Sequence, residues 1–175
     1  MALVKTIRGN VTPKFGENVF LADNATVIGE VTLGDNCTIW FNTVLRADVN
    51  YIKVGDNTNI QDLACVHGSY QTHPTNIGSN VTIGHQAMIH GCTIEDNCLI
   101  GMGATLLDGV VVKEGAMVAA GAVVLENTVV ESGTIYAGVP AKKVKEIGDR
   151  KEMIGRIGES YYKKYATWYK EEDEK

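Results

Sequence analysis

The sequence has few prolines, few aromatic residues and no long apolar run. Three residues of 175 are proline, and 7% are aromatic. No stretch approaches the roughly 20 apolar residues that a membrane-spanning helix requires, and no basic start leads into an apolar run. These absences predict a soluble, unexported chain without a membrane partner.

Positive charge and paired cysteines are also scarce. The 16 Lys and Arg residues against 21 Asp and Glu residues leave a formal net charge of -5, which offers nucleic acid no general attraction. The four cysteines show neither CxxC spacing nor the density typical of a disulfide scaffold. We therefore expect no nucleic-acid partner and a reducing, cytoplasmic location.

The chain is rich instead in a six-residue repeat. Its 19 glycines, and short Val, Ile and Thr runs between Gly-Asp-Asn turns, favour many short strands. A large apolar or aromatic residue recurs every six positions in four runs: Phe15, Leu21, Val27, Leu33, Ile39, Leu45; then Val54, Ile60, Val66; then Ile77, Ile83, Ile89; then Ile94, Ile100, Leu106, Val112, Val118, Val124, Val130 and Tyr136. Small or β-branched residues follow four places later, among them Ala25, Val31, Thr43, Thr58, Ala64, Ala87, Ala104 and Ala122.

A period of six fits neither an amphipathic helix nor independent hairpins, so it predicts an all-β solenoid. Positions four apart face the same side of an extended segment, and three hexads make one triangular coil. We assign Cys37, Cys65 and Cys98 to the small interior position. The pattern resembles the hexapeptide-repeat, left-handed parallel β-helix proteins over about residues 11 to 140. The left hand is implied by that resemblance, because the usual rule for parallel crossovers gives a right hand.

The repeat ends at Pro140, which divides the chain into a predicted β-helix domain, residues 1–140, and a C-terminal segment, residues 141–175. The second segment is predicted to form an α-helix packed on the solenoid, with a solvated tail at its end. Val144, Ile147, Ile154 and Ile157 form its predicted apolar stripe.

Three of the four histidines lie in the repeat. His67 and His90 each follow a large interior residue, and three hexads separate them if the surplus residues before Ile77 form a loop. They should therefore stack on one face, one coil apart. His85 lies on the neighbouring face, so one ion bound by all three histidines requires His85 from another chain. A contact between two different faces closes as a ring, which predicts a homotrimer.

Three neutral imidazoles and an open position make the ligand set of a catalytic zinc site, which lowers the pKa of bound water to about 7. Fe²⁺ and Co²⁺ accept the same ligands as Zn²⁺. The alternatives are surface or packed imidazoles bonded to their own backbone, and a histidine that serves an acyltransferase as general base.

Several motifs, in this order, resemble the gamma-class carbonic anhydrases: Leu45-Arg46-Ala47-Asp48, Asn59-Ile60-Gln61-Asp62, Val66-His67, and Gly84-His85-Gln86 through Ile89-His90-Gly91. The resemblance implies a homotrimer that hydrates CO₂ to bicarbonate. It also implies that the metal ligands are His67 and His90 of one subunit and His85 of its neighbour.

The resemblance also implies roles for the residues around these histidines. Arg46 and Asp62 pair at the subunit interface with Asp48 nearby, and Asn59 and Gln61 reach bound solvent or substrate oxygens. Tyr162 corresponds to an active-site tyrosine, although a tyrosine that packs the helix on the solenoid is an equal alternative.

The sequence departs from the best-characterised gamma enzymes in two acidic features linked to proton export. Val49 replaces a glutamate, and residues 68–76 replace a long acidic loop. His73 in this loop is a candidate shuttle, with a merely solvated histidine as the alternative. Two further classes stay open: a hexapeptide acyl- or acetyltransferase that uses coenzyme A, and a trimeric scaffold subunit with a poorly active metal site.

Overall fold

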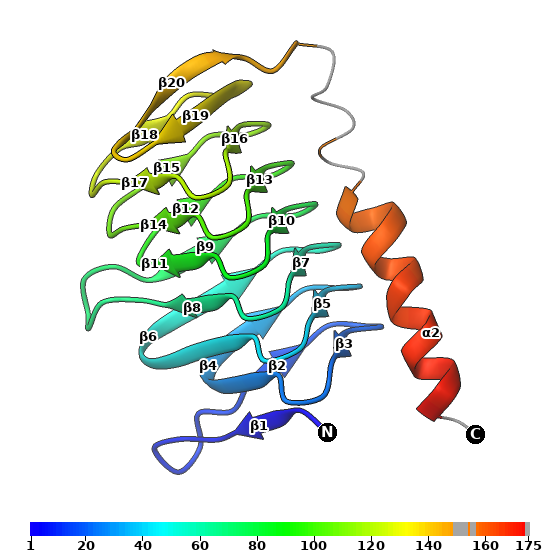
Figure 1. Ribbon diagram of the computed structural model, residues 1–175. Coiled ribbons are helices and arrows are strands. Elements are labelled where there is room, and N and C mark those ends of the chain that lie inside the picture. Colours follow the sequence, from blue (N-terminus) through cyan, green and yellow to red (C-terminus); the bar gives the residue numbers. More distant parts are fainter. Residues whose placement is uncertain (149–153, 155–156, 174–175) are drawn as a thin grey trace.

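The structure is a computed structural model that describes residues 1–148, 154 and 157–173. The chain winds as a left-handed parallel β-helix with a C-terminal helix beside it, as the repeat and its resemblance predicted (Figure 1). Each coil places short strands on three faces, and strands of successive coils pair in parallel.

The first face carries His67 and His90. Its strands are β1 (Leu3–Lys5), the first part of β4 (Thr26–Leu33), the first part of β6 (Val44–Val54), β8 (Cys65–His67), β11 (Met88–His90), β14 (Thr105–Leu106) and β17 (Val123–Val124).

The second face continues from the first because β4 and β6 bend around the edge between them. Its other strands are β2 (Lys14–Phe15), β9 (Thr75–Ile77), β12 (Thr93–Ile94), β15 (Val111–Val112) and β18 (Val129–Val130). At the edge, Gly29 pairs with Ala47 but Val31 pairs with Ile52, so β6 holds three surplus residues there (52 − 47 = 5 against 31 − 29 = 2). Asp48 lies in this bulge.

The third face is a separate sheet that supports the helix. It contains β3 (Phe20–Leu21), β5 (Thr38–Ile39), β7 (Asn59–Ile60), β10 (Thr82–Ile83), β13 (Leu99–Ile100), β16 (Met117–Val118), β19 (Thr134–Gly138) and β20 (Ala141–Glu146). The last pair, β19 and β20, is antiparallel.

The large and small repeat positions form the core along the whole solenoid. From Val27 to Tyr136, every large position listed from the repeat is buried, whereas Phe15 is 39% exposed because it lies in a first coil with few neighbours. Cys37 and Cys98 are buried as predicted. The assignment of Cys65 is wrong: it is half-buried and pairs across the first face with Met88 and Val44, since Ala64 occupies the small interior position.

The C-terminal segment differs from the prediction at its start, where it forms a strand, and agrees with it further on, where it forms a helix. Residues 141–146 form the strand β20 where a helix was predicted, and Val144 is therefore exposed at 61%. Further on, a π-helical segment η2 (Ile157–Tyr162) leads into α2 (Lys163–Asp173), which returns beside the third face (Figure 1). Helix α2 includes most of the predicted solvated tail. None of the described helices is long and apolar enough to cross a membrane.

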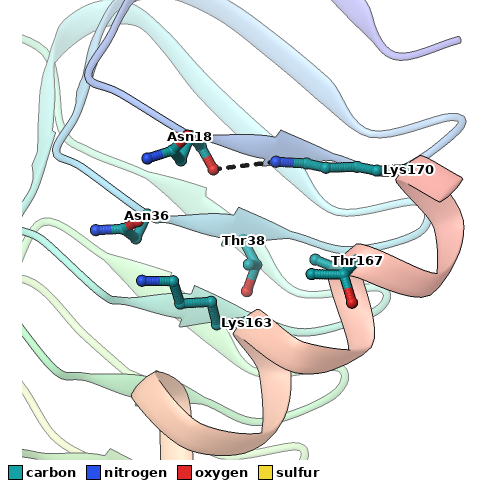
Figure 2. Close-up of a pocket in the computed structure, with 7 residues that line it drawn as sticks. Asn18, Asn36, Thr38, Lys163, Thr167 and Lys170 are labelled. Carbon is teal, nitrogen blue, oxygen red and sulfur yellow. Dashed lines mark hydrogen bonds between the residues drawn. The ribbon is translucent and has the colours of Figure 1, made fainter.

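Aromatic packing fixes this helix to the first coils. Trp40 lies 5.5 Å from Tyr162 and 5.3 Å from Phe20, measured between ring centroids, and Ala166 is buried in the same cluster. Near the C-terminal end of α2, Lys170 donates a hydrogen bond to the backbone oxygen of Asn18 at 3.3 Å (Figure 2). The third face and the helix therefore share a second apolar cluster outside the solenoid core.

Candidate metal site

His67 and His90 stack as their register predicted. Their strands β8 and β11 are neighbours, and the ladder pairs the two residues directly. Nδ1 of His67 lies 3.1 Å from Nε2 of His90, and the ring centroids are 5.2 Å apart. Two ring nitrogens on adjacent coils therefore face one another on the first face.

A carboxylate contacts the remaining nitrogen of each imidazole. Nε2 of His67 lies 3.1 Å from Oδ1 of Asp48, and Nδ1 of His90 lies 2.6 Å from Oδ1 of Asp108. Burial raises the pKa of Asp48, but hydrogen bonds from Arg46 and His67 outweigh it, so its pKa lies below the usual value. Both imidazoles thus have one nitrogen bonded to an acid and the other directed at its partner histidine.

These donors fit a metal ion. Imidazole nitrogens bind Zn²⁺ at about 2.1 Å, and two ligands of one tetrahedral ion then lie about 3.4 Å apart. The separation of 3.1 Å between His67 and His90 is close to this value. Carboxylate partners on the outer nitrogens are also typical of metal-binding histidines, because they orient the ring and increase its basicity.

His85 lies apart from this pair. It follows β10 at the turn between the third and first faces, where its Nδ1 is 2.8 Å from Oδ2 of Asp62. Its side chain is 38% exposed. Within the described part of a single chain, no group of three His, Cys, Asp or Glu side chains is arranged to hold a metal ion. A site with all three histidines is therefore not assembled inside one chain.

Arg46 and Asp62 have different partners within the chain. Nη1 of Arg46 donates to Oδ2 of Asp48 at 2.6 Å, and Asp62 contacts His85. The predicted contact between Arg46 and Asp62 concerns two subunits, so it stays a prediction. Inside one chain Asp48 is the acid that joins Arg46 to His67.

Asn59 and Gln61 lie on the third face beside His85, and both are almost fully buried. Nε2 of Gln61 donates to Oδ1 of Asn59 at 3.0 Å, while Nδ2 of Asn59 donates to Oγ1 of Thr82 at 2.8 Å. Oε1 of Gln61 is buried without a hydrogen-bond partner among the described residues. Asn59 is thus occupied in holding its neighbours, whereas Gln61 keeps one free acceptor.

Tyr162 reaches the same region from the helix. It lines a cavity of about 290 Å³ together with Gln61, and its ring also packs edge-on against Trp40. Burial raises the pKa of the Tyr162 phenol, and the charge of Asp62 adds to this effect. Both alternatives for Tyr162, a site residue and a packing residue, have a contact that supports them.

Asp108 and Ser69 were not singled out from the sequence. Ser69 Oγ donates to Oδ2 of Asp108 at 2.5 Å, and Oδ1 of the same carboxylate contacts His90. A signal for Asp108 was present: β11 and β14 pair Ile89 with Leu106, so Asp108 comes one residue after the position next to His90 in the ladder. Counting one more coil beyond the histidines reaches Leu107, the residue directly before Asp108.

A further cavity, of about 320 Å³, lies between α2 and the first coils (Figure 2). Its lining includes Lys163, Thr167 and Lys170 from the helix, with Asn18 and Asn36 from the turns of the solenoid. It contains none of the histidines or acids described above, and it is a gap left where the helix docks.

The candidate site residues thus form two groups within one chain. The paired-histidine group, on the first face, consists of Arg46, Asp48, His67, His90 and Asp108. The corner group lies where the third face meets the turn after β10 and the C-terminal helix. It consists of Asn59, Gln61, Asp62, His85 and Tyr162.

Comparison with known proteins agrees with this fold. The family model described as bacterial transferase hexapeptide (six repeats) matches residues 12–47, 74–108 and 91–126. A hexapeptide transferase family protein from Anaplasma phagocytophilum has a crystal structure with a TM-score of 0.89 at 38% identity, covering 95% of this chain and 98% of that one.

Several curated relatives are named carbonic anhydrases. The carbonic anhydrase of Geobacillus kaustophilus is 45% identical over 91% of this chain and 87% of its own length. Gamma carbonic anhydrase 2, mitochondrial, of Arabidopsis thaliana is 46% identical over 85% of this chain, and the match spans only 55% of that longer protein. The chain therefore belongs to the gamma carbonic anhydrase family of hexapeptide-repeat proteins.

Proposed function

We propose that this protein catalyses the reversible hydration of CO₂ to bicarbonate at metal sites shared between the subunits of a homotrimer. The observation that carries the proposal is the 3.1 Å separation of Nδ1 of His67 and Nε2 of His90, each ring bonded to a carboxylate on its far side. The names of its relatives in Geobacillus and Arabidopsis support the same reaction.

His67 and His90 of one chain and His85 of its neighbour would hold the ion, which is Zn²⁺, Fe²⁺ or Co²⁺. When bound, such an ion lowers the pKa of a coordinated water to about 7 and acts as a Lewis acid. In His85, Asp62 occupies Nδ1 and leaves Nε2 as the nitrogen that would bind the ion. The two groups of one chain thus belong to two different sites of the trimer.

Gln61 is the residue that orients reactants. Its buried Oε1 lacks a partner among the described residues, and an unsatisfied buried acceptor costs about 1–3 kcal/mol. A donor on bound solvent would satisfy this atom, while Asn59 holds the Gln61 amide in place at 3.0 Å. Tyr162 lines the largely apolar cavity beside them together with Gln61.

The interface brings Asp62 of one chain to Arg46 of its neighbour. Arg46 already holds Asp48 at 2.6 Å, so its guanidinium can join two acids, one from each chain, through its several donors. This contact would align the corner group of one chain with the paired-histidine group of the next.

Proton export limits turnover in this proposal. Hydration releases a proton, yet Val49 and the short loop of residues 68–76 supply no acid where the best-characterised family members have one. His73, the titratable residue of the loop, lies 3.8 Å from Oδ2 of Asp108 with its side chain 42% exposed. We therefore expect slow hydration that added imidazole buffer accelerates.

The test is to load the purified protein anaerobically with each metal and follow CO₂ hydration by the change in pH. We expect one metal per chain, a mass of three chains, and hydration that disappears with His67→Ala. Full metal occupancy without hydration, even in imidazole buffer, would remove the activity and leave a metal-binding scaffold.

The acyltransferase alternative is tested with the same preparation. We expect no coenzyme A binding by calorimetry and no hydrolysis or transfer of acetyl-coenzyme A. Stoichiometric coenzyme A binding by a metal-free trimer would reverse the assignment.

A further inference from the structure

Asp108 links three elements next to the paired histidines. It follows β14, whose Leu106 pairs with Ile89 of β11, and its side chain is 24% exposed. Oδ1 lies 2.6 Å from Nδ1 of His90, and Oδ2 accepts from Ser69 Oγ at 2.5 Å. Each carboxylate oxygen therefore has its own partner.

Gly91 makes room for this arrangement. A Cβ at Gly91 would collide with Oδ1 of Asp108, so any larger residue there would push the carboxylate away from His90. Gly91 also has a positive φ of 55°, which glycine adopts readily. The chain thus turns directly after His90 in the way that lets an acid from the next coil reach the ring.

The contact selects one form of the His90 ring. A carboxylate accepts hydrogen bonds only, so the neutral imidazole must carry its proton on Nδ1, and Nε2 then keeps its lone pair. That Nε2 is the atom facing His67 at 3.1 Å. The ring is therefore presented with its metal-binding nitrogen on the side of the other histidine.

We infer that Asp108 is a positioning residue, which fixes the tautomer and orientation of His90, and that Ser69 fixes Asp108 in turn. The role toward the metal rests on the proposed function; the role toward the ring does not. Mutation of such outer carboxylates in metal sites lowers metal affinity by about 10–100-fold.

Ser69 gives the loop between β8 and β9 a part in this arrangement. The backbone N of Ser69 donates to the backbone oxygen of His73 at 2.9 Å. The backbone oxygen of Ser69 accepts from Nδ2 of Asn50 at 3.0 Å. The loop is thus closed at its base, so the hydroxyl is directed at Oδ2 of Asp108. This leaves Oδ1 to His90 alone.

Asp48 differs from Asp108 although both contact a histidine. Asp48 shares its carboxylate between His67 and the charged Arg46, with a longer distance of 3.1 Å to the imidazole. At Asp108 the neutral Ser69 hydroxyl binds the other oxygen, Nδ1 of His73 lies farther away at 3.8 Å, and the contact with the His90 imidazole is 2.6 Å long. We therefore assign the stronger influence on ring orientation to Asp108.

The experiment compares Asp108→Asn and Ser69→Ala with Asp96→Asn, a turn aspartate that accepts from the backbone of Ser79 and lies away from the histidines. The ring ¹⁵N shifts of metal-free protein report the tautomer of His90. Competition with a chelator reports Zn²⁺ affinity, and the visible spectrum of the Co²⁺ form reports ligand geometry.

We expect Asp108→Asn to make the His90 tautomers mix, to weaken Zn²⁺ by about 10–100-fold and to change the Co²⁺ spectrum. Ser69→Ala should produce the same changes at smaller size, and Asp96→Asn none. Unchanged ¹⁵N shifts in folded Asp108→Asn protein would overturn the inference, as would an equal loss in Asp96→Asn.

A failure of the proposed function can be distinguished from a failure of this inference. If the unmodified protein binds no metal, the shared site is wrong, whereas the ¹⁵N shifts of the metal-free chain still decide the role of Asp108.

Discussion

The two groups of candidate site residues differ in how many of their polar atoms have a partner within one chain. In the paired-histidine group, every ring nitrogen of His67 and His90 has a neighbour within 3.1 Å. In the corner group, Oε1 of Gln61 is buried without a partner among the described residues, and His85 is held through Nδ1 alone. The first group is therefore assembled within one chain, whereas under the proposed function the second group would be completed by a neighbouring subunit.

The difference follows from where the groups lie. The paired histidines occupy a flat face on which parallel ladders hold neighbouring coils about 4.8 Å apart. The corner group combines a turn, a strand and a helix, so its members have few shared neighbours. A second chain docked at the corner would supply what is missing there.

The largest effect should come from separating the groups onto different chains. His85→Ala and His90→Ala trimers should each lose metal and activity entirely. A random trimer formed by unfolding and refolding an equal mixture should recover about a quarter of the sites, because three quarters of trimers are mixed and each mixed ring has one intact site of three.

This result separates shared from internal sites, since no single chain in the mixture holds all three histidines. A mixture without recovered metal, in trimers shown by mass to be mixed, would contradict the shared site. Mixing His67→Ala with His90→Ala is the matched control, and it should recover nothing.

Truncation of Trp40 should weaken the corner group without disturbing the paired histidines. Trp40→Ala removes the ring that contacts Phe20 and Tyr162, and large-to-small changes of this kind cost about 3–5 kcal/mol. Chemical unfolding measures this loss. Trp168→Ala, on α2 and with Trp168 54% exposed, should change stability by only about 0.5 kcal/mol.

For Trp40→Ala, the His67 and His90 ¹⁵N shifts should stay at their original values while the ring proton shifts of Tyr162 change. Equal perturbation of both histidines would show that the two groups are mechanically coupled.

Replacement of Gln61 tests the free acceptor directly. Gln61→Leu keeps the approximate volume but removes Oε1, so we expect kcat/KM for CO₂ hydration to fall by about 10–100-fold, equivalent to roughly 1.4–2.7 kcal/mol. Metal content should not change, because Gln61 contacts Asn59 and none of the histidines. Loss of metal would assign Gln61 to the structure of the site instead.

The smallest effect concerns the thiols. Burial raises the pKa of Cys37 to about 11 and those of Cys92 and Cys98 to about 12, so these groups stay protonated and unreactive at pH 8. Cys65, half-buried on the first face, should be the first to react with iodoacetamide, followed by mass spectrometry. Its rate should rise with pH as more thiolate forms.

Cys65→Ser should remove this first labelled site and leave metal binding unchanged. Rapid labelling of Cys37 in the folded protein would contradict the interior assignment.

The repeat predicted most of the fold because it is a local property. The residue that follows four places after a large position faces the same interior wherever the chain is extended, so Cys37 and Cys98 were placed correctly. Cys65 was misplaced because it lies five places after Ile60. The strand β20 was missed because its Lys-rich composition resembles a helix, while its pairing with β19 depends on a turn at Pro140.

The site was predicted in part for the same reason. Counting hexads placed His67 beside His90, and the ladder confirms it. Counting did not include the next coil, so Asp108 was missed. The contacts of Asp48 with both Arg46 and His67 within one chain were not predicted either, because the bulge that brings these residues together leaves no periodic signal.

The sequence by itself determined the coil, its interior and the stacking of two histidines, because a six-residue period dictates which side chains share a face. Only the tertiary structure decided which polar atoms meet: Asp108 with His90, Asp62 with His85, and Gln61 with an acceptor to spare. Such contacts join residues from different coils, and their distances depend on bulges, turns and helix docking that a period does not encode.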